Sequence, residues 1–229
     1  MNDSNAWGKR AVVYSSGTAT ASLPAHRVLR NTYALLALTL TFSAAVAALS
    51  AALNLPHPGI IITLVGYFGL LFATHKLSQS AWGLGAVFAL TGFMGYTLGP
   101  IVNHYLAMQG GSEIVAMAFG GTALIFFGLS AWVLTSKRDF SFMGGFLFAG
   151  MIVALLAGLA AVFFQIPALS LTVSAAVVLL MSGMILFETS RIIQGGETNY
   201  ILATVSLFVS IFNLFTSLLQ LLGFMSSDD

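Results

Sequence analysis

The stretch YILATVSLFVSIFNLFTSLLQLLGF, residues 200–224, is a long apolar run without a charged side chain. About 20 apolar residues in a helix cross the hydrocarbon core of a bilayer, so this run predicts a membrane span. Its polar residues recur at alternating spacings of four and three, which places them on one face of a helix: Ser206, Ser210, Asn213, Ser217 and Gln220. A polar face inside a membrane predicts that other helices cover this span, in the middle of a bundle.

Two interpretations of this polar face remain open. Its side chains form hydrogen bonds between helices, or they line an aqueous or ion path. Both place the last span at the centre of the protein.

Six further apolar runs precede it, with ends uncertain by about two to four residues. They are Tyr33–Leu53, Pro58–Thr74, Trp82–Val102, Ile114–Leu134, Phe140–Phe164 and Leu169–Phe187. The composition agrees, because 58% of the residues are hydrophobic and 7% are charged, whereas about 25% are charged in soluble domains. We therefore predict an all-α membrane protein, a bundle of seven transmembrane helices over residues 28–226. Residues 1–27 are predicted to form a flexible polar cytoplasmic tail.

The basic residues set the orientation. All eight fall before the first run or in the second, fourth and sixth connections: Lys9, Arg10, Arg27, Arg30, Lys76, Lys137, Arg138 and Arg191. Short loops rich in Lys and Arg stay in the cytoplasm. The N-terminus is therefore predicted inside and the C-terminus outside, in a multi-pass protein of a bacterial inner (plasma) membrane.

Several functional classes are disfavoured. The chain has no cysteine, and its net charge of +1 includes no basic cluster for nucleic acid. No His-Glu-x-x-His spacing, nucleophile elbow or phosphate loop is present. We predict a non-enzymatic protein without cofactor or resident metal, with the lipid bilayer as its surroundings and a monomer as the favoured state.

Small residues predict how the helices pack. Gly92, Gly95 and Gly99 form one stripe, and Gly150, Ala154 and Gly158 form another, so close helix contacts are expected at both. Pro100 is expected to end or kink the third span. The short connections predict that consecutive spans are antiparallel neighbours.

Glu188 and Arg191, near the end of the sixth span, lie one turn apart and can pair. Two interpretations remain open: a structural ion pair that anchors the helix end, or a carboxylate facing a cavity on an ion pathway.

The chain resembles the Bax inhibitor-1 family, and within it the bacterial YccA-like branch. The resemblance covers roughly residues 27–224. It rests on GFMGYTLGPIV (92–102), on AMAFGGTALIFFGLSAWVLTSKRDFSFMGGFLFAG (116–150) with its loop Lys137-Arg138-Asp139-Phe140, on FETSRII (187–193) and on LFVSIFNLFTSLLQLLG (207–223), with RNTY (30–33) at the entry to the first span.

The resemblance implies seven helices with the last one surrounded by the others. It also implies a pH-dependent calcium leak through paired aspartates, which correspond here to Glu188 and Ser210. The second position lacks the carboxylate, and calcium prefers several carboxylates among six to eight oxygen ligands.

The YccA-like branch implies a different role, as a substrate and modulator of the FtsH membrane protease. This is our leading hypothesis, with the polar tail as the segment that enters the protease. The alternative is a pH-sensitive calcium or cation leak through the last span, with calcium only as the permeant ion. Its candidate residues for the ion path or for pH sensing are Glu188, Arg191, Ser210 and Asn213.

Overall fold

The computed structural model describes residues 22–226, and all regular structure within them is helical. The elements are α1 (Ser22–Ala52), α2 (Ile60–Leu77), α3 (Trp82–Leu106), α4 (Gly111–Ser136), the short 3₁₀ helix η1 (Ser141–Met143), α5 (Gly144–Phe163), α6 (Pro167–Ile193) and α7 (Tyr200–Met225). Seven of these helices are long and apolar enough to cross a membrane. The predicted all-α bundle of seven transmembrane helices is confirmed.

Helix ends differ from the predicted runs by a few residues in most cases, but α1 begins much earlier. The predicted tail ended at residue 27, whereas α1 starts at Ser22, so the predicted boundary falls inside the helix. The prediction followed apolar runs, so it did not include polar residues such as Arg27 and Arg30 in the helix. A helix can continue beyond the bilayer into such polar sequence. Residues 1–21 of the predicted tail lie outside the described residues.

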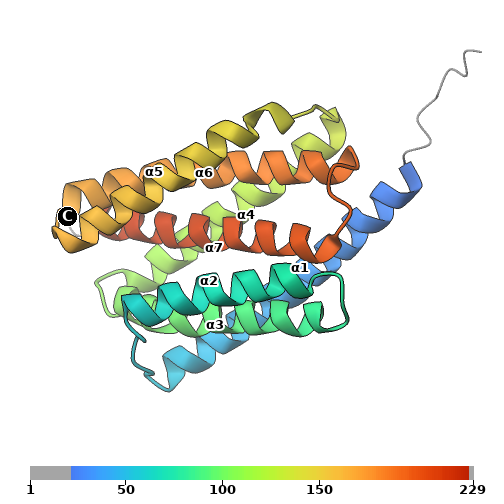
Figure 1. Ribbon diagram of the computed structural model, residues 1–229. Coiled ribbons are helices and arrows are strands. Elements are labelled where there is room, and N and C mark those ends of the chain that lie inside the picture. The colour runs from blue at the N-terminus through green and yellow to red at the C-terminus, as the bar shows by residue number, and fades with distance from the viewer. Residues whose placement is uncertain (1–21, 227–229) are drawn as a thin grey trace, which may run out of the picture.

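Helix α7 runs through the middle of the bundle, between the α5–α6 pair and the α2–α3 pair (Figure 1). Half of its most apolar stretch is buried inside the protein, the largest share of the seven spans. Helices α1, α3, α4 and α6 pack directly on it. The central position predicted from its polar face is therefore correct, although α2 packs mainly on α3, and α5 on α6.

The prediction that consecutive spans are neighbours is wrong for two pairs. Helix α1 packs along α3 rather than α2, and α4 packs on α6 and α7 rather than α5. The glycine stripe of α3 explains the first case. A Cβ on Gly95 would overlap the Ser43 carbonyl oxygen of α1, and one on Gly92 would lie 2.9 Å from the Phe42 ring. Only glycine permits so close an approach of the two backbones.

The start of α1 and the α2–α3, α4–α5 and α6–α7 connections all lie at one end of the bundle, opposite the C-terminus (Figure 1). The described basic residues gather at this end, as the charge pattern predicted: Arg27, Arg30, Lys76, Lys137, Arg138 and Arg191. Lys9 and Arg10 lie outside the described residues. We call this the cytoplasmic end, following the rule that basic loops stay inside.

Candidate functional site

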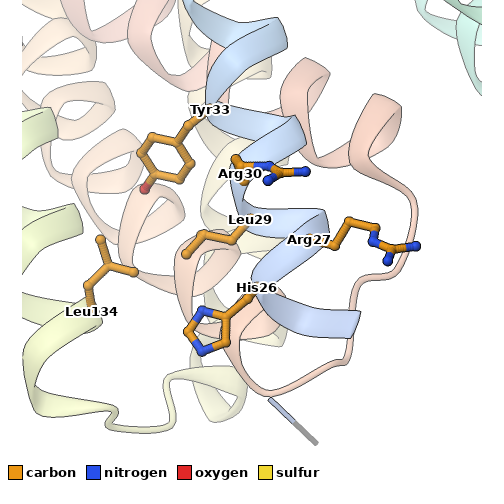
Figure 2. A pocket seen from close by; sticks show the side chains of 6 residues that line it. All are labelled: His26, Arg27, Leu29, Arg30, Tyr33 and Leu134. Atoms are coloured by element: carbon orange, nitrogen blue, oxygen red, sulfur yellow. The ribbon is translucent and has the colours of Figure 1, made fainter. Parts of the chain in front are cut away.

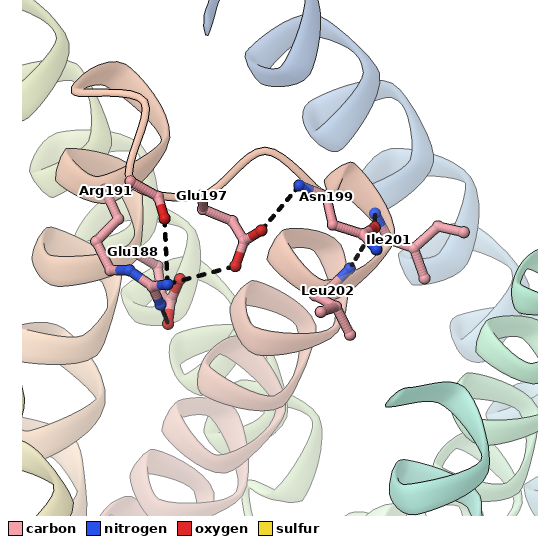
Figure 3. Close-up of polar contacts among 7 residues, drawn as sticks. Glu188, Arg191, Glu197, Asn199, Ile201 and Leu202 are labelled. Atoms are coloured by element: carbon pink, nitrogen blue, oxygen red, sulfur yellow. Dashed lines mark hydrogen bonds and ion pairs between the residues drawn. The ribbon is translucent and has the colours of Figure 1, made fainter. Parts of the chain in front are cut away.

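An ion cluster connects α6 to the loop that leads into α7 at the cytoplasmic end. The Arg191 guanidinium lies 3.5 Å from a Glu188 carboxylate oxygen and 3.5 Å from a Glu197 carboxylate oxygen. Figure 3 shows this guanidinium between the two carboxylates. Glu188 is only 4% exposed, and the Ser206 side chain of α7 lies beside its carboxylate. The pairing of Glu188 with Arg191 therefore extends to α7.

Glu197 is the member of this cluster that the sequence analysis missed. Its second oxygen accepts a hydrogen bond from the Asn199 backbone N–H, at 2.8 Å. Asn199 is the N-cap of α7, because its side-chain oxygen accepts from the N–H groups of Ile201 and Leu202. An acidic residue just before an Asn that opens an apolar run is the signal that could have found it.

The Asn199 side chain also connects this loop to a second connection. Its amide nitrogen donates to the Ser78 carbonyl, at 3.2 Å, in the link between α2 and α3. One asparagine thus satisfies the free N–H groups of α7 and holds two cytoplasmic loops together. The cluster is a partly buried set of ion pairs, in which the two carboxylates of Glu188 and Glu197 share one guanidinium.

Ser210 and Asn213 lie on α7 and form hydrogen bonds within that helix. The Ser210 hydroxyl donates to the Ser206 carbonyl, at 2.9 Å, and the Asn213 amide donates to the Val209 carbonyl, at 2.8 Å. Neither bond reaches Glu188. Within residues 22–226, no three His, Asp or Glu side chains come together as a metal-binding group. These contacts do not favour the calcium or cation leak.

At the opposite end of the polar face, Gln220 joins α7 to α6. The Ser174 hydroxyl donates to the Gln220 side-chain oxygen, at 2.6 Å, and the Gln220 amide donates to the Ser170 hydroxyl. Together with Ser206 beside Glu188, these contacts favour the interpretation that the polar face forms hydrogen bonds between helices.

Backbone conformation and hydrogen bonds to α6 fix the position of the loop Lys137-Arg138-Asp139 of the family motif. Lys137 ends α4 in the left-handed conformation, with φ of 51°. The buried Ser190 hydroxyl of α6 donates to the Arg138 carbonyl, at 3.2 Å, and accepts from the Phe140 N–H, at 3.0 Å. This hydroxyl therefore holds the loop against α6.

Asp139 stabilises the turn that follows this loop. One of its carboxylate oxygens accepts from the Ser141 N–H, at 2.8 Å. Hydrogen bonds from the Ser141 hydroxyl and backbone hold the pKa of the Asp139 carboxyl below its ordinary value.

Comparison with known proteins identifies the family of this chain and several relatives. Residues 25–227 match the family described as inhibitor of apoptosis-promoting Bax1. A protein of Escherichia coli strain K12, named modulator of FtsH protease YccA, is 56% identical over 217 residues, which cover 95% of this chain and 99% of that protein. A Pseudomonas aeruginosa protein is 58% identical over 202 residues, covering 88% of this chain and 91% of its own length.

The names of such relatives favour a membrane protein that is not an enzyme. A relative from another Escherichia coli strain, O6:H1, is named inner membrane protein YccA and is also 56% identical over 95% of this chain and 99% of its own length. With seven spans of its own, the present protein is a multi-pass inner membrane protein. Its family match and its identity to YccA show that the chain belongs to the Bax inhibitor-1 family, in the bacterial YccA-like branch.

Proposed function

We propose that this protein modulates an FtsH-type membrane protease, and that it acts by protein contact rather than by chemistry. The observation that carries the proposal is the 56% identity, over nearly the whole length of both chains, to the modulator of FtsH protease YccA. The alternative, a calcium or cation leak, is not favoured, because Ser210 stands where a second carboxylate would be needed and bonds within its own helix.

The N-terminal segment is the part that the protease would engage. Residues 1–21 precede α1 and, on the predicted topology, lie in the cytoplasm. A protease that pulls on this end must extract α1 from the bundle before any other helix. Resistance to extraction therefore depends on the contacts of α1.

Helix α1 is held at several points between Thr32 and Ala51. Near its cytoplasmic end, the Thr204 hydroxyl of α7 donates to the Thr32 carbonyl, at 3.2 Å. In its middle, Gly95 of α3 packs against the Ser43 backbone. Near its outer end, the Asn103 amide of α3 donates to the Ala51 carbonyl, at 2.8 Å. A substrate gripped by its tail but slow to unfold would occupy the protease and so restrain the turnover of other substrates.

The direct test deletes residues 1–20 and measures the half-life of the protein in cells with and without the protease. We expect the truncated protein to be more stable, and the turnover of a second membrane substrate to change. A variant with residues 1–20 in scrambled order keeps length and composition and should behave as the native protein. An unchanged half-life after deletion would contradict the proposal.

A second test weakens the hold on α1 while leaving the tail intact. Gly95→Leu forces α1 away from α3, so we expect faster degradation and weaker restraint of the second substrate. Gly85→Leu on the same helix is the matched control, because a Cβ at Gly85 meets no atom within 4 Å. If both variants behave alike, the packing of α1 does not set the resistance to extraction.

A further inference from the structure

A pocket of about 610 Å³ lies between the start of α1 and the end of α4, at the cytoplasmic end. It is lined by His26, Arg27, Leu29, Arg30 and Tyr33 of α1 and by Leu134 of α4. Helices α1 and α4 do not pack extensively on each other, although both pack on α7. The space between their cytoplasmic ends is therefore left unfilled by the bundle.

The polar lining of this pocket is basic. Besides the uncharged Tyr33, its polar residues are His26, Arg27 and Arg30, and no carboxylate of residues 22–226 lines it. Within residues 22–226, the ion pairs involve Arg191 and neither of these two arginines. Arg27 and Arg30 both line the pocket, and in Figure 2 their guanidinium groups extend outward from α1 on the side away from Leu134, where they can meet a charged group that approaches from outside the bundle.

Tyr33 provides a hydrogen-bond donor deeper in the pocket. Its hydroxyl is buried and has no hydrogen-bond partner among the described residues. Figure 2 shows the phenol, together with Leu29, directed toward Leu134. The Ser130 hydroxyl, one turn before Leu134 on α4, is likewise buried and without a partner in the described part of the chain. Buried hydroxyls normally have a partner, which a bound polar group or water can supply.

The remaining walls are apolar and continue along the outside of α4. Leu29 and Leu134 line the pocket itself. Farther along α4, Phe127 and Leu124 are 65% and 77% exposed, as expected for side chains that face lipid. A ligand with an anionic head and a hydrocarbon chain would match both parts of this surface.

We propose that this pocket binds the phosphate headgroup of an anionic phospholipid from the cytoplasmic leaflet. Arg27 and Arg30 attract the phosphate at the mouth, since guanidinium groups match phosphate oxygens in geometry and charge. Tyr33 donates a hydrogen bond from within, and an acyl chain lies along the apolar face of α4. Basic pockets between transmembrane helices at the cytoplasmic side are suited to anionic headgroups.

The test uses the purified full-length protein in mild detergent and native mass spectrometry. Phosphatidylglycerol and phosphatidylcholine with the same acyl chains are added at equal concentrations. We expect preferential retention of phosphatidylglycerol, and about a fivefold loss of affinity for each arginine removed in the Arg27→Gln/Arg30→Gln variant. Lys137→Gln/Arg138→Gln is the matched control, because it removes two charges from the same end outside the pocket, and it should change retention less than twofold.

Tyr33→Phe provides an independent variant that keeps both charges and the ring, and it should weaken retention several-fold. If the arginine variant melts at a lower temperature than the native protein, its loss of lipid can come from a damaged fold. The retention measured with Tyr33→Phe then tests the proposal by itself. Equal retention of the two lipids, an equal loss in the Lys137→Gln/Arg138→Gln control, or an unchanged Tyr33→Phe variant would each overturn the proposal. Inorganic phosphate is added in a separate arm. If it binds alone and displaces the lipid, the pocket is a site for free phosphate instead.

Discussion

The Ser50 hydroxyl of α1 donates a hydrogen bond, at 3.0 Å, to the Tyr96 carbonyl of α3. Pro100 lies four residues after Tyr96 and has no N–H, so this carbonyl lacks its usual partner within the helix. Ser50 supplies that partner from the neighbouring helix. Of the two outcomes predicted for the proline, an end or a kink of the span, the first is wrong, because α3 continues past it to Leu106.

Ser50→Ala should destabilise the protein by about 1–3 kcal/mol, because it leaves the Tyr96 carbonyl without a donor inside the bundle. Thermal unfolding in detergent would measure the loss. Pro100→Ala restores an N–H to α3, so adding it to Ser50→Ala should recover part of the stability. Additive effects of the two substitutions would show that they do not act on the same carbonyl.

Gly95→Ala should also destabilise the protein, by about 1–3 kcal/mol, because the added methyl would overlap the Ser43 backbone of α1. The same measurement on Gly85→Ala serves as control. Its methyl meets open space, and alanine favours the helix, so the melting temperature should stay the same or rise. A loss of similar size at both positions would mean that the contact between α1 and α3 is not the cause.

Arg191→Met should destabilise the cytoplasmic end, because it leaves the buried Glu188 and the adjacent Glu197 without a counter-charge. We expect the free energy of unfolding to fall by about 2 kcal/mol. Breaking a fully buried ion pair typically costs about 3–5 kcal/mol, and the expected loss is smaller because the Arg191 side chain is 31% exposed. Glu188→Gln/Arg191→Met removes both charges and should unfold at a temperature closer to that of the native protein. If the double variant is less stable than Arg191→Met, the unpaired carboxylate does not explain the loss.

Asp139→Asn should cause a small, pH-dependent loss of stability in the α4–α5 connection. The pKa of Asp139 is lowered in the folded protein by its hydrogen bonds with Ser141. Its contribution is therefore complete above the unfolded value of about 3.9 and disappears as the pH falls through the lower folded value. Melting temperatures of native protein and variant should differ at pH 7 and converge below about pH 4. A difference that stays constant down to pH 3 would exclude the carboxylate as its source.

Much of this architecture followed from local properties of the chain. The lengths of the apolar runs predicted seven spans, since each run needs only to match the thickness of the bilayer. The basic residues predicted which connections share an end. The polar face of residues 200–224 predicted that the last helix is central, because polar groups in a membrane need protein partners.

Only the tertiary structure decided which helices touch and which polar groups meet. Helices in lipid gain no hydrophobic energy by associating, so their pairing depends on close fit between small residues. That fit placed α1 against Gly95 rather than beside α2. It also brought Ser50 to the carbonyl opposite Pro100, and Asn199 to the Ser78 carbonyl between α2 and α3. Contacts of this kind depend on where two distant backbones approach each other, which the spacing of residues along the chain does not specify.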